Sequence, residues 1–202
     1  SEFFNMLSGF SIPQSWRRLI PAPLWMKDYF LRKIAREAAN AKAGKPARII
    51  AKINSLVDEN VIRELYNASC AGVKIDLIVR GICCLRAGIP GMSENITVRS
   101  ITGRFLEHSR IFYFCNEGHE DIYLASADWM PRNFFSRLEI AFPILDPKIF
   151  AYLRDVVLPA YLSDVAKGRE LKSNTKWVRR TATASGSMDR LRSQVLFREL
   201  AV

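Results

Sequence analysis

Histidines and paired cysteine motifs are scarce in this sequence. It contains two histidines and four cysteines, the latter at positions 70, 83, 84 and 115, and no two cysteines have the CxxC spacing. A structural zinc site needs four such ligands at suitable spacing, so none is predicted. We expect the cysteines to be reduced and buried.

Long hydrophobic runs are also missing. No stretch approaches the roughly 18 consecutive apolar residues of a membrane-spanning helix, and the first residues lack the basic and apolar pattern of a secretory signal. The sequence therefore predicts a cytoplasmic chain, with peripheral attachment to the inner membrane left open.

Positive charge, by contrast, is in excess. The 202 residues are 49% hydrophobic and 25% charged, which is typical of a chain that buries a core of its own. The net charge of +10 favours polyanionic partners, among them nucleic acid, anionic lipid, nucleotides and inorganic phosphate chains. Charge alone does not choose among them.

Apolar periodicity predicts an α/β fold. Residues 24–43 have helical spacing, and the apolar runs at 47–53 and 73–79 are predicted strands that flank a helix capped by Asp58. Strands joined in this way are parallel, so Asn54 and Arg80 should lie at the same carboxyl edge of a sheet. Ligands of open α/β sheets bind at that edge.

The remaining pattern sets the domain organisation. We expect a loop at 81–95, strands at 96–101 and 137–144 on either side of a hairpin, and a helix at 146–162. The predicted parts are an irregular lead-in from a preceding domain at 1–23, the α/β domain at 24–165, and a basic tail at 166–202. Within the tail we expect a flexible link at 181–187 and a final helix at 188–200.

The hairpin carries a group of polar residues that fits phosphate. His108 and Arg110 begin its first apolar run, and its second run ends in Ser126 and Asp128. Because the ends of a hairpin are neighbours, these four side chains should meet and form a phosphoryl-binding site. Arg80 adds a guanidinium that can fork onto phosphate oxygens. Other cations near His108 in sequence are Arg104, Arg132 and Arg137.

Each of these residues also has a purely structural interpretation. A single histidine beside apolar residues is more often a packed one, and Ser-x-Asp after a strand is also a common turn or helix cap. Trp129 is expected to pack in the core. His119, in the polar hairpin tip, is expected to be a solvated loop residue.

Four segments together resemble the C-terminal third of the large bacterial polyphosphate kinases, which move the terminal phosphate of ATP onto a polyphosphate chain and back. The segments are 47–58, 71–83, 103–110 and 126–133, and the resemblance covers residues 4–165 and the tail at 174–176. It implies a mixed sheet flanked by helices of the phospholipase D-like type, and a parent chain of four domains. It also implies a homo-oligomer, and nucleic acid is not expected as a partner.

The resemblance implies roles for two residues. In the family, the residues at the positions of Arg80 and His108 contact the ATP phosphates, and His108 is the expected catalytic residue. The supporting candidates are Arg104, Arg110, Ser126, Asp128 and Arg132. The family's phosphorylated histidine lies in another domain, and Mg²⁺ is implied without ligands in this chain, so the isolated chain is expected to be inactive.

Two other functions stay open. The phospholipase D pattern His-x-Lys-x4-Asp occurs here as His108 and Arg110, but position 115 is a cysteine. This departure puts autonomous phosphodiesterase activity in doubt, although a nuclease or phospholipase that dimerises through two copies of His108 is one alternative. A non-catalytic module that binds polyanions is the other.

Overall fold

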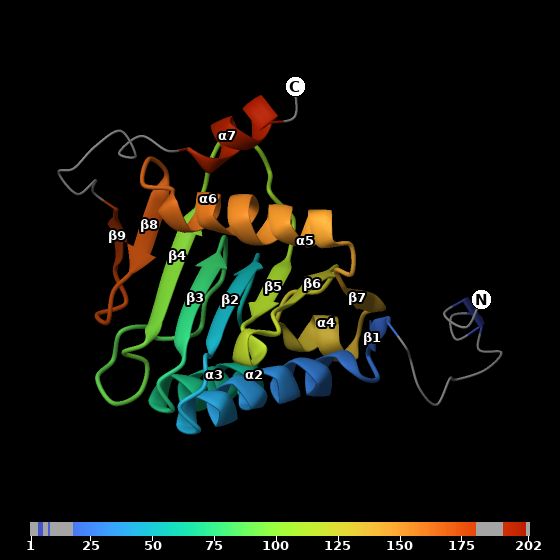
Figure 1. Ribbon diagram of the computed structural model, residues 1–202. Coiled ribbons are helices and arrows are strands. Elements are labelled where there is room, and N and C mark those ends of the chain that lie inside the picture. Colours follow the sequence, from blue (N-terminus) through green and yellow to red (C-terminus); the bar gives the residue numbers. More distant parts are fainter. Residues whose placement is uncertain (1–3, 6–7, 9–17, 181–191, 201–202) are drawn as a thin grey trace.

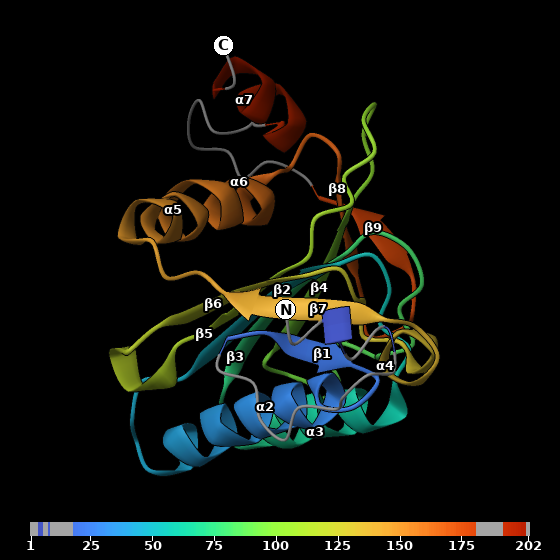
Figure 2. The ribbon, with the colours of Figure 1, turned by 90° about the vertical axis from the view of Figure 1, so that its right-hand side faces the viewer.

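The computed structural model describes residues 4–5, 8, 18–180 and 192–200. A mixed sheet lies between two layers of helices, with α2 (Met26–Lys42) and α3 (Glu59–Cys70) on one face and α5 (Pro147–Tyr152) and α6 (Leu158–Ser163) on the other (Figures 1 and 2). This three-layer arrangement confirms the predicted α/β class.

Nine strands form the sheet in the order β1-β7-β6-β5-β2-β3-β4-β8-β9. The pairs β2–β3 and β3–β4 are parallel, and all other neighbours are antiparallel. The strands are β1 (Ile20–Ala22), β2 (Arg48–Ile53), β3 (Lys74–Val79), β4 (Ile96–Ile101), β5 (Ile111–Phe114), β6 (Asp121–Ala125), β7 (Glu139–Pro143), β8 (Gly168–Leu171) and β9 (Trp177–Arg179).

The parallel centre of the sheet forms as the sequence predicts. The Asp58 side chain accepts hydrogen bonds from the backbone N–H groups of Asn60 and Val61 and so caps α3, which connects β2 to β3. The register pairs Ile53 with Val79. Asn54 and Arg80, one residue further on each strand, therefore lie side by side at the carboxyl edge.

The predicted hairpin is β5 and β6. Ile111 pairs with Leu124, so the segment that carries His108 and Arg110 enters the hairpin beside the place where β6 leaves it. A short 3₁₀ turn, Asn116–Gly118, joins the strands. His119, at this tip, is exposed as expected.

The sheet extends beyond the segment 24–165 at both ends. In the lead-in that the sequence predicted to be irregular, residues 20–22 form the edge strand β1, which pairs with β7. In the basic tail, β8 pairs with β4 and β9 pairs with β8. All three strands are short, and β9 is exposed along its length. None of them gives the alternating apolar pattern that marks a half-buried strand.

The predicted helices are present with modified ends. The helix expected at 146–162 consists of α5, a π-helical turn (Leu153–Val157) and α6. A short helix, α4 (Pro131–Phe135), was not expected, and the final helix is α7 (Ser193–Leu200). The flexible link predicted at 181–187 and the start of the final helix at 188 lie outside the described residues. Within the described parts, no helix is both long and apolar enough to cross a membrane.

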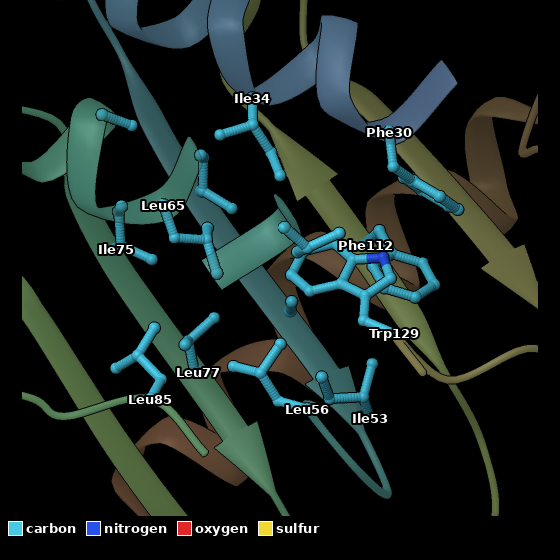
Figure 3. Close-up of a cluster of buried hydrophobic side chains, with 14 of the residues drawn as sticks. Phe30, Ile34, Ile53, Leu56, Leu65, Ile75, Leu77, Leu85, Phe112 and Trp129 are labelled. Atoms are coloured by element: carbon cyan, nitrogen blue, oxygen red, sulfur yellow. The ribbon is translucent and has the colours of Figure 1, made fainter. Parts of the chain in front are cut away.

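Two hydrophobic cores hold the layers together. The larger core lies between the sheet and α2 and α3, and Phe30, Phe112 and Trp129 pack against one another in it (Figure 3). Trp129 is fully buried, which confirms that it is a packing residue. The smaller core, which includes Ile50 and Tyr161, lies under α5 and α6.

The prediction that the cysteines are buried is wrong. Cys70 and Cys84 are exposed, and Cys83 and Cys115 are partly buried. Cys70 ends a helix and Cys84 lies in the loop after β3, and both places are at the surface. Burial raises the pKa of the Cys83 thiol to about 11, so this thiol stays protonated at neutral pH.

Candidate phosphate-binding site at the carboxyl edge

The site begins with Arg80 at the end of β3. Its Nε atom donates a 3.0 Å hydrogen bond to Oδ1 of Asn54, the residue that follows β2. Gly81 follows, and its N–H donates to the Asn54 carbonyl oxygen at 2.8 Å. A Cβ atom at position 81 would lie 3.0 Å from that same oxygen, so glycine permits this close approach of the two strand ends.

Asp128 holds the strand ends together. Its Oδ1 atom accepts a 2.7 Å hydrogen bond from the buried backbone N–H of Asn54. Arg110 forks onto the same carboxylate, with Nε 3.0 Å from Oδ1 and Nη2 3.0 Å from Oδ2. The end of the hairpin is therefore fixed to the end of β2 through one buried carboxylate.

The electrostatics keep Asp128 ionised. Burial alone would raise the pKa of this carboxyl group, but the hydrogen bonds from Arg110 and from the Asn54 backbone outweigh burial and hold the pKa below its usual value. The bound guanidinium neutralises the carboxylate, so the aspartate adds no net repulsion towards an anion at this edge.

His108 lies at the open end of this network. Its side chain is exposed, so the interpretation as a packed core histidine is wrong. Nη1 and Nη2 of Arg110 lie 3.3 and 3.4 Å from its two ring nitrogens, and the His108 carbonyl oxygen accepts from Nη1 at 3.2 Å. Arg110 therefore holds both the ring and the backbone of His108 beside Asp128.

Lys52 supports the His108 segment from below, and the sequence did not single it out. Its Nζ atom donates to the carbonyl oxygen of Ser109 at 3.0 Å, lies 3.9 Å from Glu107 Oε2, and sits over the Tyr161 ring. Burial lowers the pKa of Lys52 to about 8, while the Glu107 carboxylate opposes that shift. The sequence signal for this residue was a lysine within the apolar run at 49–53.

The structure separates the other candidates from this network. The Ser126 hydroxyl donates to the buried carboxylate of Glu139, which Asn133 also contacts. Arg104 is exposed in the loop before β5, with its guanidinium near the Phe105 ring, and Arg132 is exposed on α4. Within the described residues, neither arginine side chain bonds to Arg80, Asp128 or His108.

The donor set does not fit a metal ion. Among the described residues no group of three or more histidine, cysteine, aspartate or glutamate side chains could hold one. Both oxygens of Asp128 already accept hydrogen bonds from Arg110. The chemistry that this edge offers is anion binding by cationic and neutral donors.

The mixed sheet with helices on both faces defines the domain as one of phospholipase D-like fold. Its fold is similar to the crystal structure of Nuc, a phospholipase D family member from Salmonella typhimurium, with a TM-score of 0.55 over 77% of this chain and 97% of that one, at 13% identity. That likeness concerns the fold alone.

The family follows from closer relatives. The family described as polyphosphate kinase C-terminal domain 2 matches residues 19–194, and the chain belongs to it. The polyphosphate kinase of Pseudomonas putida is 50% identical over 184 residues, which are 91% of this chain and 25% of that protein. The crystal structure of polyphosphate kinase from Porphyromonas gingivalis has a TM-score of 0.91 at 39% identity, covering 99% of this chain and 30% of that one. The chain thus spans about a quarter of the length of its curated relatives.

Proposed function

We propose that this chain is the part of a polyphosphate kinase that binds the phosphates of ATP and completes the active site, in an enzyme that transfers the terminal phosphoryl group of ATP to inorganic polyphosphate and back. The availability of Arg80 carries the proposal. Nε binds Asn54, while the two terminal nitrogens of the guanidinium have no acceptor in the described part of the chain. A planar pair of free donors fits two phosphate oxygens.

Arg80 and His108 have different roles in this proposal. Arg80 stabilises the charge that develops on the phosphoryl group during transfer, and His108 binds a phosphate and donates a proton to the departing oxygen. The nucleophilic histidine belongs to another domain of the parent protein. Arg110, Asp128 and Lys52 are positioning residues, because they hold the segment that carries His108. Arg104, Ser126 and Arg132 remain candidate supporting residues, although their side chains form no bond to this network among the described residues.

The proposed function also implies the partners of the chain. They are ATP or ADP, inorganic polyphosphate, the remaining domains of the parent protein and further copies of it, in the cytoplasm or at the inner membrane surface. Nucleic acid is not among them. Magnesium would enter with the nucleotide, because the described residues offer it no cluster of ligands.

Replacement of Arg80 in the parent enzyme tests the proposal. We expect both Arg80→Ala and Arg80→Lys to lower kcat/KM by roughly a hundredfold, because either loses the forked donor pair and one such transition-state contact contributes about 3 kcal/mol. The matched control is Arg63→Lys on the exposed face of α3, which should leave kcat/KM unchanged. Near-normal turnover of Arg80→Lys would contradict the bidentate role.

A second experiment tests the division of labour between domains. The isolated chain, incubated with radiolabelled ATP, should neither elongate polyphosphate nor acquire a phosphohistidine. A stable label on His108 would show that the nucleophile lies in this domain. Cleavage of a generic phosphodiester by the chain alone would instead favour the nuclease alternative.

A further inference from the structure

A second cationic feature adjoins Arg80. A cleft of about 530 Å³ lies between the ends of β3 and β4 and the hairpin formed by β8 and β9. Its lining includes Arg80, Ser100, Lys167, Arg169, Trp177 and Arg179. This β8–β9 cleft is within the range of roughly 300–1,000 Å³ that small-molecule sites occupy. Arg80, which belongs to the candidate phosphate-binding site, therefore also forms one wall of the cleft.

Strand register explains why four of these side chains share one face. Ser100 on β4 pairs with Arg169 on β8, and Arg169 pairs with Arg179 on β9. Paired residues in a sheet point to the same side, and Trp177, two residues before Arg179, points there too. The last two strands extend the sheet sideways beyond β4 (Figure 1). Arg169 and Arg179 lie on these two strands as a register pair.

The cations of the cleft lack the partners that surface cations usually have. No lining residue is acidic, and none of Arg80, Lys167, Arg169 or Arg179 forms an ion pair with a carboxylate among the described residues. Among the described residues, the Arg179 side chain bonds only the Ala166 carbonyl oxygen, at 3.3 Å. Four unneutralised cations along one cleft attract a ligand with repeated negative charge.

We propose that the β8–β9 cleft binds the inorganic polyphosphate chain beyond the phosphate that reacts near Arg80. This inference rests on the proposed function and adds a track for the acceptor. Polyphosphate carries a charge on every unit, so each of several spaced cations finds a phosphate. An adenine base is uncharged and would use only the Trp177 ring.

Binding of polyphosphates of two lengths to the 202-residue chain tests the proposal. The test variant is Arg169→Ala/Arg179→Ala. The matched control is Arg63→Ala/Lys74→Ala, which removes the same charge from exposed positions on α3 and at the opposite end of β3. Thermal unfolding of each variant checks that the fold is intact. The probes are tripolyphosphate, long-chain polyphosphate and ATP, at one fixed salt concentration.

We expect the test variant to bind long-chain polyphosphate roughly tenfold more weakly, since two exposed charge contacts are lost, with little change for tripolyphosphate or ATP. The control variant should keep the affinity of the unmodified chain. In the parent enzyme, the test variant should raise KM for long polyphosphate and leave KM for ATP and kcat unchanged.

The results that would contradict the proposal can be told apart from one another. Equal losses of affinity for long-chain polyphosphate in the two double variants would mean that net charge alone determines binding, and would overturn the proposed role of the cleft. Unchanged affinity in both variants would overturn it as well. Weaker binding of ATP with unchanged polyphosphate affinity would assign the cleft to the nucleotide and overturn the proposal. A parent enzyme that transfers no phosphate to polyphosphate would overturn the proposed function itself, whereas the outcomes above would overturn the cleft alone.

Discussion

Replacement of Asp128 by asparagine tests the network that holds the site. Asp128→Asn keeps the shape of the side chain and one carbonyl oxygen for the Asn54 N–H, but it removes the charge that faces Arg110. The side chains of Arg110 and Asp128 are only 10% and 8% exposed, so solvent screens the pair weakly. The substitution therefore leaves a mostly buried guanidinium without its counter-charge.

The expected cost follows from this geometry. Removing one partner of a buried ion pair costs about 3–5 kcal/mol, and the retained acceptor for Asn54 places this variant near the lower end, about 3 kcal/mol. The pKa of Asp128 in the folded protein lies below its value of 3.8 in an unfolded chain. The stabilisation is therefore present above that unfolded value and is lost as the pH falls through the folded pKa.

Urea unfolding of the unmodified chain and of Asp128→Asn, at neutral and at acid pH, measures the difference between their free energies of unfolding. The free energies of unfolding should differ by about 3 kcal/mol at pH 7 and converge at acid pH. The control is Asp155→Asn, because its carboxylate is paired with Arg154 at the exposed surface and its loss should matter little. A difference for Asp128→Asn below about 1 kcal/mol at pH 7 would refute the reasoning, because that is the size of an ordinary surface effect.

Four further outcomes are expected. Because the pKa of Lys52 is lowered to about 8, activity of the parent enzyme should fall above that pH, and Lys52→Arg should move this alkaline limb upward; a limb that stays in place would exclude Lys52. From the same group, the free energy of unfolding should rise between pH 8 and 10.5, since the unfolded chain binds more protons in that window. A variant with all four cysteines changed to serine should keep its turnover, and loss of turnover with intact folding would implicate a thiol. Phe30→Ala should cost about 3–5 kcal/mol in urea unfolding, since Phe30 is fully buried, and a cost below about 1 kcal/mol would contradict its place in the core.

The parts of the fold that the sequence predicts correctly are those with dense local signals. The apolar runs of β2 and β3 with the Asp58 cap between them predict the parallel pair, and so place Arg80 beside Asn54. The two runs of the hairpin likewise bring Arg110 to Asp128. In both cases, elements close in sequence determine the contact.

The missed features depend on contacts between distant segments. β8 and β9 exist because β4 offers them an open edge, and their basic composition gives no strand signal. The burial of Lys52 requires α6 to bring Tyr161 over it. The role of Ser126 depends on Glu139 in the neighbouring strand, so Ser-x-Asp alone could not separate a binding residue from a structural one.

The pairing of β1 with β7 has a consequence for the growing polypeptide. Ile20 pairs with Ala141, which is 121 positions later (141 − 20). At a synthesis rate of about 5–20 residues per second, β1 waits roughly 6–24 s on the ribosome before its partner exists. During that delay the central strands can already pair locally, whereas β1 lacks its strand partner. A translation product that stops before Glu139 therefore leaves β1 unpaired, with the apolar side chain of Ile20 open to chaperones or proteases.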